Sequence, residues 1–329
     1  MSTIIGRAII AGGGAKTLVY TVSGATVTAV NGSSTVTAAA DATGKVELTL
    51  GKSGVWNITA EKDGKSSLTK QVALPPTLML PLRPVANISP TSGVTYTDGL
   101  DGATPELMHL YGEAISDNAE ILRTTSTVYL DFGADSRKLT VGDVMDFSIN
   151  GTTVQARLIS FNTDDLADTS AYGEETATGK CGMTFDTVTI VTSAQMNTGN
   201  TNVGGWEASR MRSTTMPELL ASIPEAWRDV LMTRSLTNNK GTTPTEDILS
   251  LHSQNDIGSS GYNWYAAGNS KVKNNASGSA VVWWLRDAYT GNSAYFLIVN
   301  SSGSVNNNNA SNSYGVVPGF ARHRQDLVG

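Results

Sequence analysis

The densest group of side chains suited to hydrogen-bonded recognition lies between Trp283 and Phe320. This window reads WWLRDAYTGNSAYFLIVNSSGSVNNNNASNSYGVVPGF and holds seven asparagines, four of them consecutive. Asparagine and serine offer adaptable donors and acceptors, and tyrosine adds a rigid amphipathic ring at low entropic cost. We expect a ligand-binding surface made of Asn292, Ser293, Tyr295, Leu297, Asn300, Ser301, Asn306, Asn307, Asn308, Asn309, Asn312 and Tyr314, with Tyr262, Trp264 and Tyr265 from the Gly- and Asn-rich loop 255–275.

A plainer interpretation of the same window stays open. Asparagine-rich runs tolerate left-handed backbone, so these residues could equally form solvated turns. The alternation in residues 294–300 predicts a strand, in which alternate side chains face the core. Arg286 is expected to pair with a carboxylate such as Asp287 or Glu207. Four large apolar side chains are expected in the core: Trp283, Trp284, Leu285 and Phe320.

Signatures of catalysis are weak in this chain. The three histidines, His109, His252 and His323, are isolated from one another, and neither an HExxH nor a GxSxG motif occurs. Four acidic residues fall in a predicted loop, where we expect them to be solvated, with a hydrolase pair as the alternative. They are Asp164, Asp165, Glu174 and Glu175. We predict no catalytic residue, no metal and no cofactor.

The single cysteine and the lectin signatures give further limits. Cys181 cannot form an internal disulfide or a cysteine-rich zinc site, and we expect a small buried side chain. The EPN and WND signatures of calcium-dependent sugar lectins are missing, so calcium-independent binding is predicted. Gly12–Gly14 followed by Lys16 lacks the GK[ST] ending of a phosphate loop and is expected to form a turn.

The composition favours strands and turns over long helices. Only 16% of the 329 residues are charged, and glycine numbers 33. A net charge of -6 argues against a nucleic-acid partner, because phosphate binding needs clustered Lys and Arg. The start of the chain lacks a signal-peptide pattern, and no apolar run approaches the ~18 residues of a membrane span. Neither a cleaved signal nor membrane insertion is therefore expected.

The pattern along the chain predicts three segments. Residues 1–82 alternate apolar and polar in short runs separated by turns such as Asn31-Gly32, which predicts a β-sandwich. This part resembles the immunoglobulin-like and prealbumin-like attachment modules of surface and tail proteins. Residues 83–105 are rich in proline and glycine and predict a semi-rigid linker. Residues 106–329 are expected to form a C-terminal domain.

Within this domain, Thr104 and Pro105 predict the N-cap and first turn of a helix. Pro217 and Pro224 each begin a run with apolar residues at helical spacing, which predicts two short helices. Residues 237–245 are expected to form a polar loop. Strands are expected over 126–132, 144–149, 153–161, 187–191 and 247–251.

An ordered set of motifs in this half resembles a known family. The motifs are Val141-Gly142-Asp143, GWEASRMR at 205–212, WWLR at 283–286, YF at 295–296, VNSSGS at 299–304 and YGVVPGF at 314–320. They look like a family from gut bacteria and their phages whose members end in WWLRSP and GVRPaf. That family is similar to the C-type-lectin fold of formylglycine-generating enzymes and of phage tail-tip adhesins of the major-tropism-determinant type. Asp287 and Val317 depart from its pattern, where relatives often carry Ser and Arg.

The resemblance implies a C-type-lectin-like domain, with two short helices packed on a small twisted sheet and a ligand face formed by the last strands and loops. The overall fold is thus expected to be mainly β with short helices. In some such adhesins a diversity-generating retroelement rewrites adenines in the codons of the last loops. Because asparagine codons are adenine-rich, the window before GVVPGF suggests a diversified segment.

We therefore expect a phage tail-tip receptor-binding protein, located on the virion and extracellular when it acts. Its partners would be a host-surface receptor, either protein or glycan, and other tail proteins bound through residues 1–82. A homotrimer is expected, because several weak sites gain avidity when they bind together. The alternatives are a bacterial surface adhesin of the same fold and an enzyme similar to formylglycine-generating enzymes.

Overall fold

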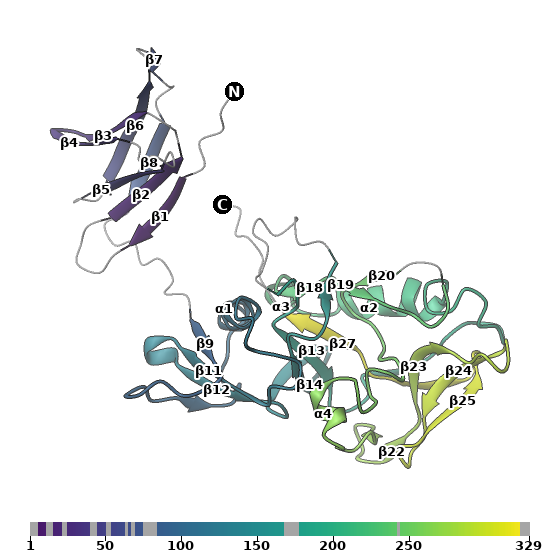
Figure 1. The fold of residues 1–329 in the computed structure, drawn as a ribbon. Helices are drawn as coiled ribbons and strands as arrows, with labels where there is room; N and C mark the ends of the chain where they lie inside the picture. Colours follow the sequence, from purple (N-terminus) through teal and green to yellow (C-terminus); the bar gives the residue numbers. More distant parts are fainter. Residues whose placement is uncertain are drawn as a thin grey trace. The chain divides into compact units, whose positions relative to one another are not determined.

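The computed structural model describes residues 6–10, 16–21, 25–39, 45–50, 54–62, 65–66, 70–74, 84–167, 178–241 and 244–322. Gly12–Gly14, Glu174, Glu175 and His323 lie outside these ranges. The chain divides into two compact units, Met1–Leu82 and Arg83–Gly329 (Figure 1). Strands predominate and the helices are few and short, which confirms the predicted mainly-β fold. No helix in the described ranges has the length and apolar character needed to span a bilayer.

The first unit consists of two antiparallel sheets with a shared core. One sheet has the order β1-β2-β5, and the other runs β4-β3-β6-β7 with β8 also paired to β6. Leu48 of the first sheet is buried against Val27 and Trp56 of the second, so the sheets pack as the predicted sandwich. The strands are β1 (Gly6–Ile10), β2 (Lys16–Thr21), β3 (Thr26–Asn31), β4 (Ser34–Ala39), β5 (Lys45–Leu50), β6 (Gly54–Lys62), β7 (Lys65–Ser66) and β8 (Lys70–Leu74).

The segment 83–105, which we expected to be a linker, is part of the second unit. Its strands β9 (Val85–Asn87) and β10 (Thr97–Asp98) lie at the two edges of a sheet with the order β10-β12-β11-β9. Leu100 from this segment is 2% exposed. Proline is tolerated beside an edge strand because no ladder hydrogen bond is lost there. Pro84 directly precedes the edge strand β9, Pro90 lies in the connection to β10, and Pro105 begins the next helix. The linker prediction is therefore wrong for the described part.

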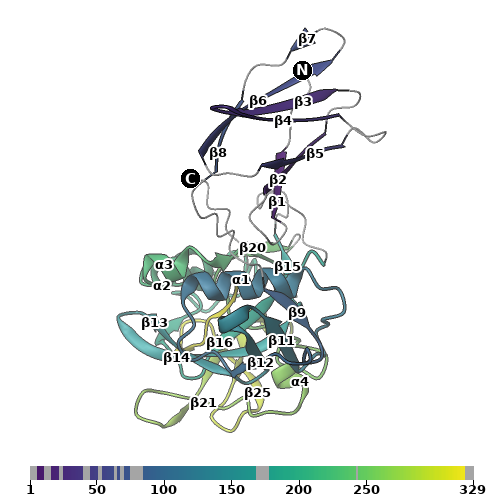
Figure 2. The same cartoon turned by 90° about the vertical axis from the view of Figure 1, so that its left-hand side faces the viewer.

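Helix α1 (Pro105–Ser116) begins where the sequence predicted it. The hydroxyl of Thr104 accepts a hydrogen bond from the backbone N–H of Leu107 at 3.3 Å, which satisfies a free donor of the first turn. Tyr111 and Ile115 are fully buried on one face of the helix. Through this face α1 packs on β9 and β11 (Thr127–Asp131) and also reaches the central sheet (Figure 2).

The central sheet of the second unit has the order β13-β14-β16-β27-β18. Strand β27, which comes far later in the sequence than β16, lies between β16 and β18 and pairs with both. The rings of Phe147 and Phe185 stack on Phe320 at centroid distances of 4.7 and 5.7 Å. The strands are β12 (Arg137–Thr140) of the neighbouring sheet, then β13 (Val144–Ile149), β14 (Thr152–Phe161), β16 (Met183–Thr187), β18 (Leu231–Met232) and β27 (Gly319–Arg322).

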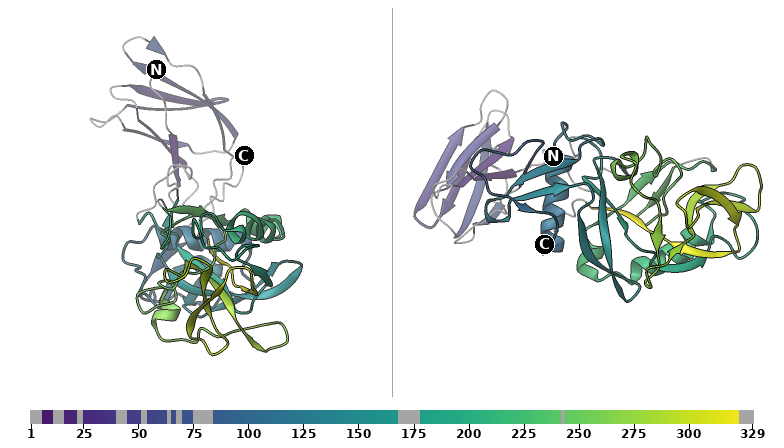
Figure 3. Two further views of the ribbon diagram at one scale, coloured as in Figure 1. Left: turned by 90° about the vertical axis from the view of Figure 1, so that its right-hand side faces the viewer. Right: turned by 90° about the horizontal axis from the view of Figure 1, so that it is seen from below.

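A second five-stranded sheet carries the Trp-Trp-Leu-Arg motif. Its order is β17-β26-β23-β24-β25. The central sheet lies between this sheet and the sheet that contains β11 and β12 (Figures 1 and 3). Trp284 joins the main core, whereas Trp283 joins a second buried cluster with Tyr262 and Val317. The expected burial of the two tryptophans, Leu285 and Phe320 is confirmed. The strands are β17 (Thr192–Gln195), β23 (Trp283–Ala288), β24 (Tyr295–Val299), β25 (Val305–Asn309) and β26 (Ser313–Val316).

The remaining elements are short. The two expected helices are present as α2 (Met216–Ala221), which follows a π-helical turn, and α3 (Glu225–Arg228). The strands expected over 187–191 and 247–251 have other bounds. Residues 188–191 connect β16 to β17, and the second strand, β20, ends at Asp247. The other elements are a 3-10 turn (Gly133–Asp135), β15 (Asp165–Leu166), β19 (Arg234–Leu236), β20 (Thr245–Asp247), α4 (Asn263–Ala266), β21 (Lys273–Asn274) and β22 (Ala280–Val281).

Two buried polar side chains have apolar surroundings. Cys181 is fully buried, as expected, and burial raises the pKa of its thiol well above its usual value. Arg322 is also fully buried, and its guanidinium makes no hydrogen bond or ion pair with the described residues. Aromatic rings surround it instead, the nearest being Trp227 at 4.2 Å from the ring centroid. Burial lowers the pKa of Arg322 to about 9.

Candidate functional site

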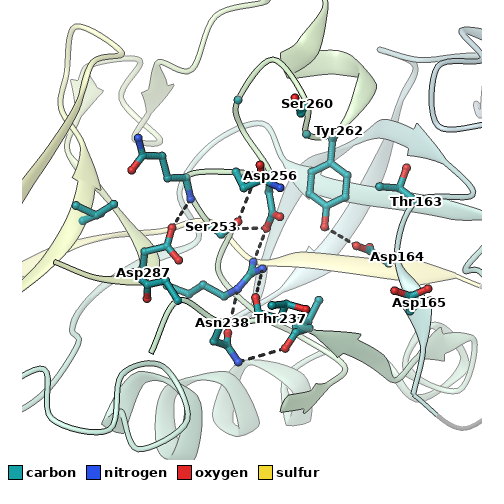
Figure 4. Close-up of a pocket in the computed structure, with 18 of the residues that line it drawn as sticks. Thr163, Asp164, Asp165, Thr237, Asn238, Ser253, Asp256, Ser260, Tyr262 and Asp287 are labelled. Carbon is teal, nitrogen blue, oxygen red and sulfur yellow. Dashed lines mark hydrogen bonds and ion pairs between the residues drawn. The ribbon is translucent and has the colours of Figure 1, made fainter. Parts of the chain in front are cut away.

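A polar cleft of about 760 Å³ opens on the second unit (Figure 4). Five parts of the chain form it: residues 163–165 at the start of β15, residues 235–239 at the end of β19 and after it, the loop 253–262, the last part of β23, and Leu297 of β24. Hydroxyl, amide and carboxylate groups dominate its lining, with Leu236 and Leu297 as the apolar exceptions. Its volume lies within the range of about 300–1,000 Å³ that is usual for ligand pockets.

Arg286 holds two walls of the cleft together. The register between β23 and β24 shifts after Trp284, and the N–H of Arg286 donates to the carbonyl of His252 at 2.8 Å instead of to a neighbouring strand. Its guanidinium donates to the carbonyls of Leu251 and Thr237 at 3.1 and 3.2 Å and to Oδ1 of Asn238 at 3.2 Å. One strand thereby fixes both flanking loops.

The carboxylate that pairs with Arg286 is Asp256. We expected Asp287 or Glu207, but Glu207 is exposed, and Asp287 binds a backbone N–H instead. Burial opposes the ionisation of Asp256, yet the charge of the adjacent guanidinium holds its pKa below the usual value. A charged pair therefore lies under the loop 253–262, where it fixes the loop conformation.

A second buried ion pair supports the opposite wall. Oδ2 of Asp164 accepts hydrogen bonds from Arg234 at 3.2 Å and from Thr184 at 2.9 Å, and Oδ1 accepts from the hydroxyl of Tyr262 at 2.7 Å. Arg234 also donates to the carbonyl of Gly319 at 2.7 Å. Asp164 is only 8% exposed, so the prediction that it is a solvated loop acid is wrong. Its neighbour Asp165 is exposed, as predicted.

Asp287 differs from the other carboxylates of the cleft. It is 6% exposed, and its Oδ2 accepts the N–H of Gln254 at 2.5 Å. Its other oxygen makes no hydrogen bond with the described residues, and no cation lies within ion-pair distance of it in that part of the chain. Burial raises the pKa of Asp287, although the Gln254 N–H and the nearby Arg286 charge oppose that effect.

The aromatic residues expected to bind ligand lie mostly beneath the surface. Tyr262 lines the cleft but is 2% exposed, and Tyr265 is 3% exposed with its hydroxyl bound to Asp186. Trp264 is half-buried, with the guanidinium of Arg157 at 4.4 Å from its ring centroid. A Cβ at Gly142, whose φ is +111°, would lie 2.8 Å from this indole, which explains the glycine of the Val141-Gly142-Asp143 motif.

Asp186 belongs to a buried cluster that has no opening. Its Oδ2 accepts from Nζ of Lys273 at 2.7 Å, and Nε2 of His252 lies 3.7 Å from the same oxygen. All three side chains are almost completely enclosed. Although burial opposes ionisation, the lysine charge holds the pKa of Asp186 far below the usual value. The cluster joins β16 to β21 and is a structural support. Within the described residues, no three metal-ligating side chains gather.

The four consecutive asparagines form the edge strand β25. Their backbone pairs with β24, and in the same register the N–H of Ala310 donates to the carbonyl of Ala294. The N–H groups of Asn307 and Asn309 therefore face the open edge. Oδ1 of Asn306 accepts the N–H of Asn307 at 2.8 Å, and Oδ1 of Asn308 accepts the N–H of Asn309 at 2.9 Å. Two of the four asparagines thus cap the edge of their own strand.

The other expected residues of this window also make local bonds. Oδ1 of Asn292 accepts the N–H of Ala294 at 2.9 Å, and Oδ1 of Asn300 accepts the N–H groups of Ser302 and Ser304. These are turn contacts, in agreement with the alternative that the asparagines of this window form turns. Ser293 and Ser301 are exposed. Half-buried positions are occupied by Tyr295, Leu297, Asn300, Asn307, Asn308, Asn309, Asn312 and Tyr314.

Sequence analysis did not identify the residue that organises this window, Asn202. Asn202 is fully buried, and its Nδ2 donates to the carbonyls of Tyr289, Asn292 and Tyr295 at 2.9, 3.0 and 2.6 Å. Nζ of Lys240 donates to its Oδ1 at 2.7 Å. Asn202 therefore holds the 289–295 loop in place from below. Of the expected ligand-binding residues, the cleft gathers only Tyr262 and Leu297.

Comparison with known proteins gives one match. A protein-family model described as a domain of unknown function, DUF6273, matches residues 182–321. The matched stretch contains the cleft residues from 235 to 287 but not Asp164 and Asp165. No curated protein and no solved structure matches the chain.

Proposed function

We propose that the chain is a receptor-binding protein of the adhesin type, whose second unit binds a ligand on the surface of a host cell. The observation that supports it is the construction of the cleft. Arg286 and Arg234 hold its walls from beneath through buried ion pairs, while neutral polar side chains line its mouth. A site fixed before the ligand arrives loses little conformational entropy on binding, which favours recognition.

The phage tail-tip assignment rests on the resemblance of the WWLR and GVVPGF motifs. In this proposal the sandwich of residues 1–82 attaches the protein to other tail proteins, and the second unit faces the host with a C-type-lectin-like fold. A homotrimer on the virion would raise the avidity of weak single sites. A diversified C-terminal window is part of the proposal. It requires a reverse-transcriptase gene and a near-copy of this segment in the neighbouring DNA.

Capture from bacterial envelope fractions tests the binding function. The immobilised full-length protein is incubated with envelope fractions from a panel of gut bacteria, and free protein is then used to compete with phage adsorption. Binding to at least one fraction and inhibition of adsorption are expected. Absence of capture from every fraction would contradict the proposal.

Two variants locate the binding surface. The first replaces exposed residues of the cleft mouth, Gln254, Asn255, Ser259 and Ser260, with alanine. The second replaces Asn306–Asn309 with alanine. We expect the first variant to lose capture and the second to retain most of it, because two of these asparagines are engaged by their own strand. The reverse result would move the binding surface to β25.

A further inference from the structure

The charges of the cleft are unevenly balanced. Asp164 is paired with Arg234, Asp256 with Arg286, and the exposed Asp165 with Nζ of Lys180 at 2.6 Å. Each of these carboxylates therefore has a cation beside it. No cation of the described residues lies within ion-pair distance of Asp287, so the cleft carries one more carboxylate than it has paired cations, on a residue that is 6% exposed.

The cation that lines the cleft is not available to a ligand. Arg286 is 4% exposed, and its guanidinium already serves two carbonyls, one amide oxygen and Asp256. An anionic ligand would therefore meet a negative carboxylate without a free positive partner. Phosphate and uronate groups are disfavoured here, because like charges repel across a partly desolvated site.

The groups that a ligand can reach are mostly neutral. Exposed side chains at the mouth can both donate and accept hydrogen bonds: Thr237, Gln254, Asn255, Ser259 and Ser260. Hydroxyl groups of a sugar also donate and accept, so they match such a lining. A carboxylate accepts from two hydroxyls at once and forms the stronger, charge-assisted type of hydrogen bond. Asp287, with one oxygen unused, offers that acceptor on the cleft wall (Figure 4).

We infer that the cleft binds a neutral, hydroxyl-rich ligand, a glycan of the cell surface, and that Asp287 is the acceptor that anchors its hydroxyl groups. The inference rests on the proposed function and adds the ligand class and a specificity-determining residue. The bond between Gln254 N–H and Oδ2 of Asp287 orients the carboxylate. The ion pair beneath it, Arg286 with Asp256, fixes the loop that supplies Gln254.

Binding to an immobilised panel of neutral, amino-sugar and uronic-acid oligosaccharides tests the inference. Full-length protein is expected to bind neutral members, with an affinity that changes little with added salt. Asp287→Asn should weaken binding by about tenfold or more, because a charge-assisted hydrogen bond is lost. Asp165→Asn is the matched control. It removes an exposed, already paired carboxylate of the same cleft, and less than a threefold change is expected.

The other outcomes have separate meanings. Binding confined to amino sugars, with a steep loss in salt, would overturn the neutral class in favour of a cationic ligand. Equal binding by the wild type and Asp287→Asn would remove Asp287 from the site. If no glycan binds while a protease-sensitive envelope component is still captured, the glycan inference fails and the proposed function stands. Failure of all envelope capture removes the proposed function as well.

A second variant covers the case in which Asp287→Asn folds poorly. Thermal unfolding of each variant is measured first. Asn255→Ala changes an exposed side chain of the same mouth and leaves the ion pairs intact. It should weaken binding to the same neutral oligosaccharides, and unchanged binding by a folded Asn255→Ala would count against the cleft.

Discussion

The cleft and the strand β25 are both rich in polar side chains, but their polar groups are used differently. In the cleft, buried ion pairs hold the backbone, so Gln254 at the mouth and Asp287 on the wall keep hydrogen-bonding capacity. In β25, the side-chain oxygens of Asn306 and Asn308 accept hydrogen bonds from backbone N–H groups of the same strand. A run of asparagines can therefore serve to protect a sheet edge, and the binding capacity of a surface depends on which groups are already engaged.

The largest effect is expected when the support of the cleft is removed. Arg286→Met leaves Asp256 and two carbonyls buried without their donor, and we expect a loss of about 3–5 kcal/mol in the free energy of unfolding. Chemical denaturation measures it. Lys180→Met, which breaks an exposed pair of the same cleft, is the control and should cost far less. Equal losses would mean that the buried pair does not support the cleft.

Arg322 differs from Arg286, because no carboxylate of the described residues pairs with its buried guanidinium. Arg322→Met removes a desolvated charge and keeps an apolar side chain among the rings of Trp227 and Phe320. We expect a stability that is unchanged or up to about 2 kcal/mol higher, since the lost cation–π contacts offset part of the gain. The same denaturation experiment tests it. A loss as large as that of Arg286→Met would contradict the distinction between paired and unpaired arginines.

The edge function of β25 predicts a smaller change in stability and a change in association. Asn306→Ala with Asn308→Ala frees two outward N–H groups, and we expect a loss of about 0.5 kcal/mol for each and self-association through the open edge. Asn307→Ala with Asn309→Ala is the matched control. Size-exclusion chromatography with light scattering compares the two, and identical elution of both variants and the wild type would rule out the capping role.

The smallest effect concerns Asp287 and pH. Burial raises its pKa, so the folded protein binds its proton more tightly than the unfolded chain, and stability is lost as pH rises from the ordinary Asp value through the raised one. Asp287→Asn should therefore melt at the same or a slightly higher temperature at pH 7. That difference should shrink towards pH ~4, near the ordinary Asp pKa. A variant that melts clearly lower at pH 7 would show that the carboxylate stabilises the fold.

The elements that local patterns specify could be predicted from the sequence. Period-two alternation predicted a β-sandwich in residues 1–82, and Thr104 with Pro105 predicted the start of α1. The burial of Trp283 and Trp284 followed from their size and apolar character. These features depend on residues that are close together in the chain, so the sequence alone is enough to predict them.

The cleft could not be predicted, because its members meet only in three dimensions. Asp164 next to Asp165 looks like a solvated acidic pair, and only Arg234, 70 residues later, makes it a buried ion pair. The linker prediction failed for a related reason, since prolines that flank short strands or begin a helix give the same pattern as prolines in a linker. The role of Asn202 could not be predicted from any sequence pattern, because its three acceptors are backbone carbonyls of a loop that is distant in the chain.

The position of β27 has a consequence for how the second unit is made. This strand fills the gap between β16 and β18, yet it is synthesised after every other strand of that sheet. While the ribosome is still translating the residues before Gly319, the inner edges of both neighbours lack their partner. The unit must therefore complete its fold after residue 322 has left the exit tunnel, and a nonsense mutation between β18 and β27 would leave a chain with an open central sheet.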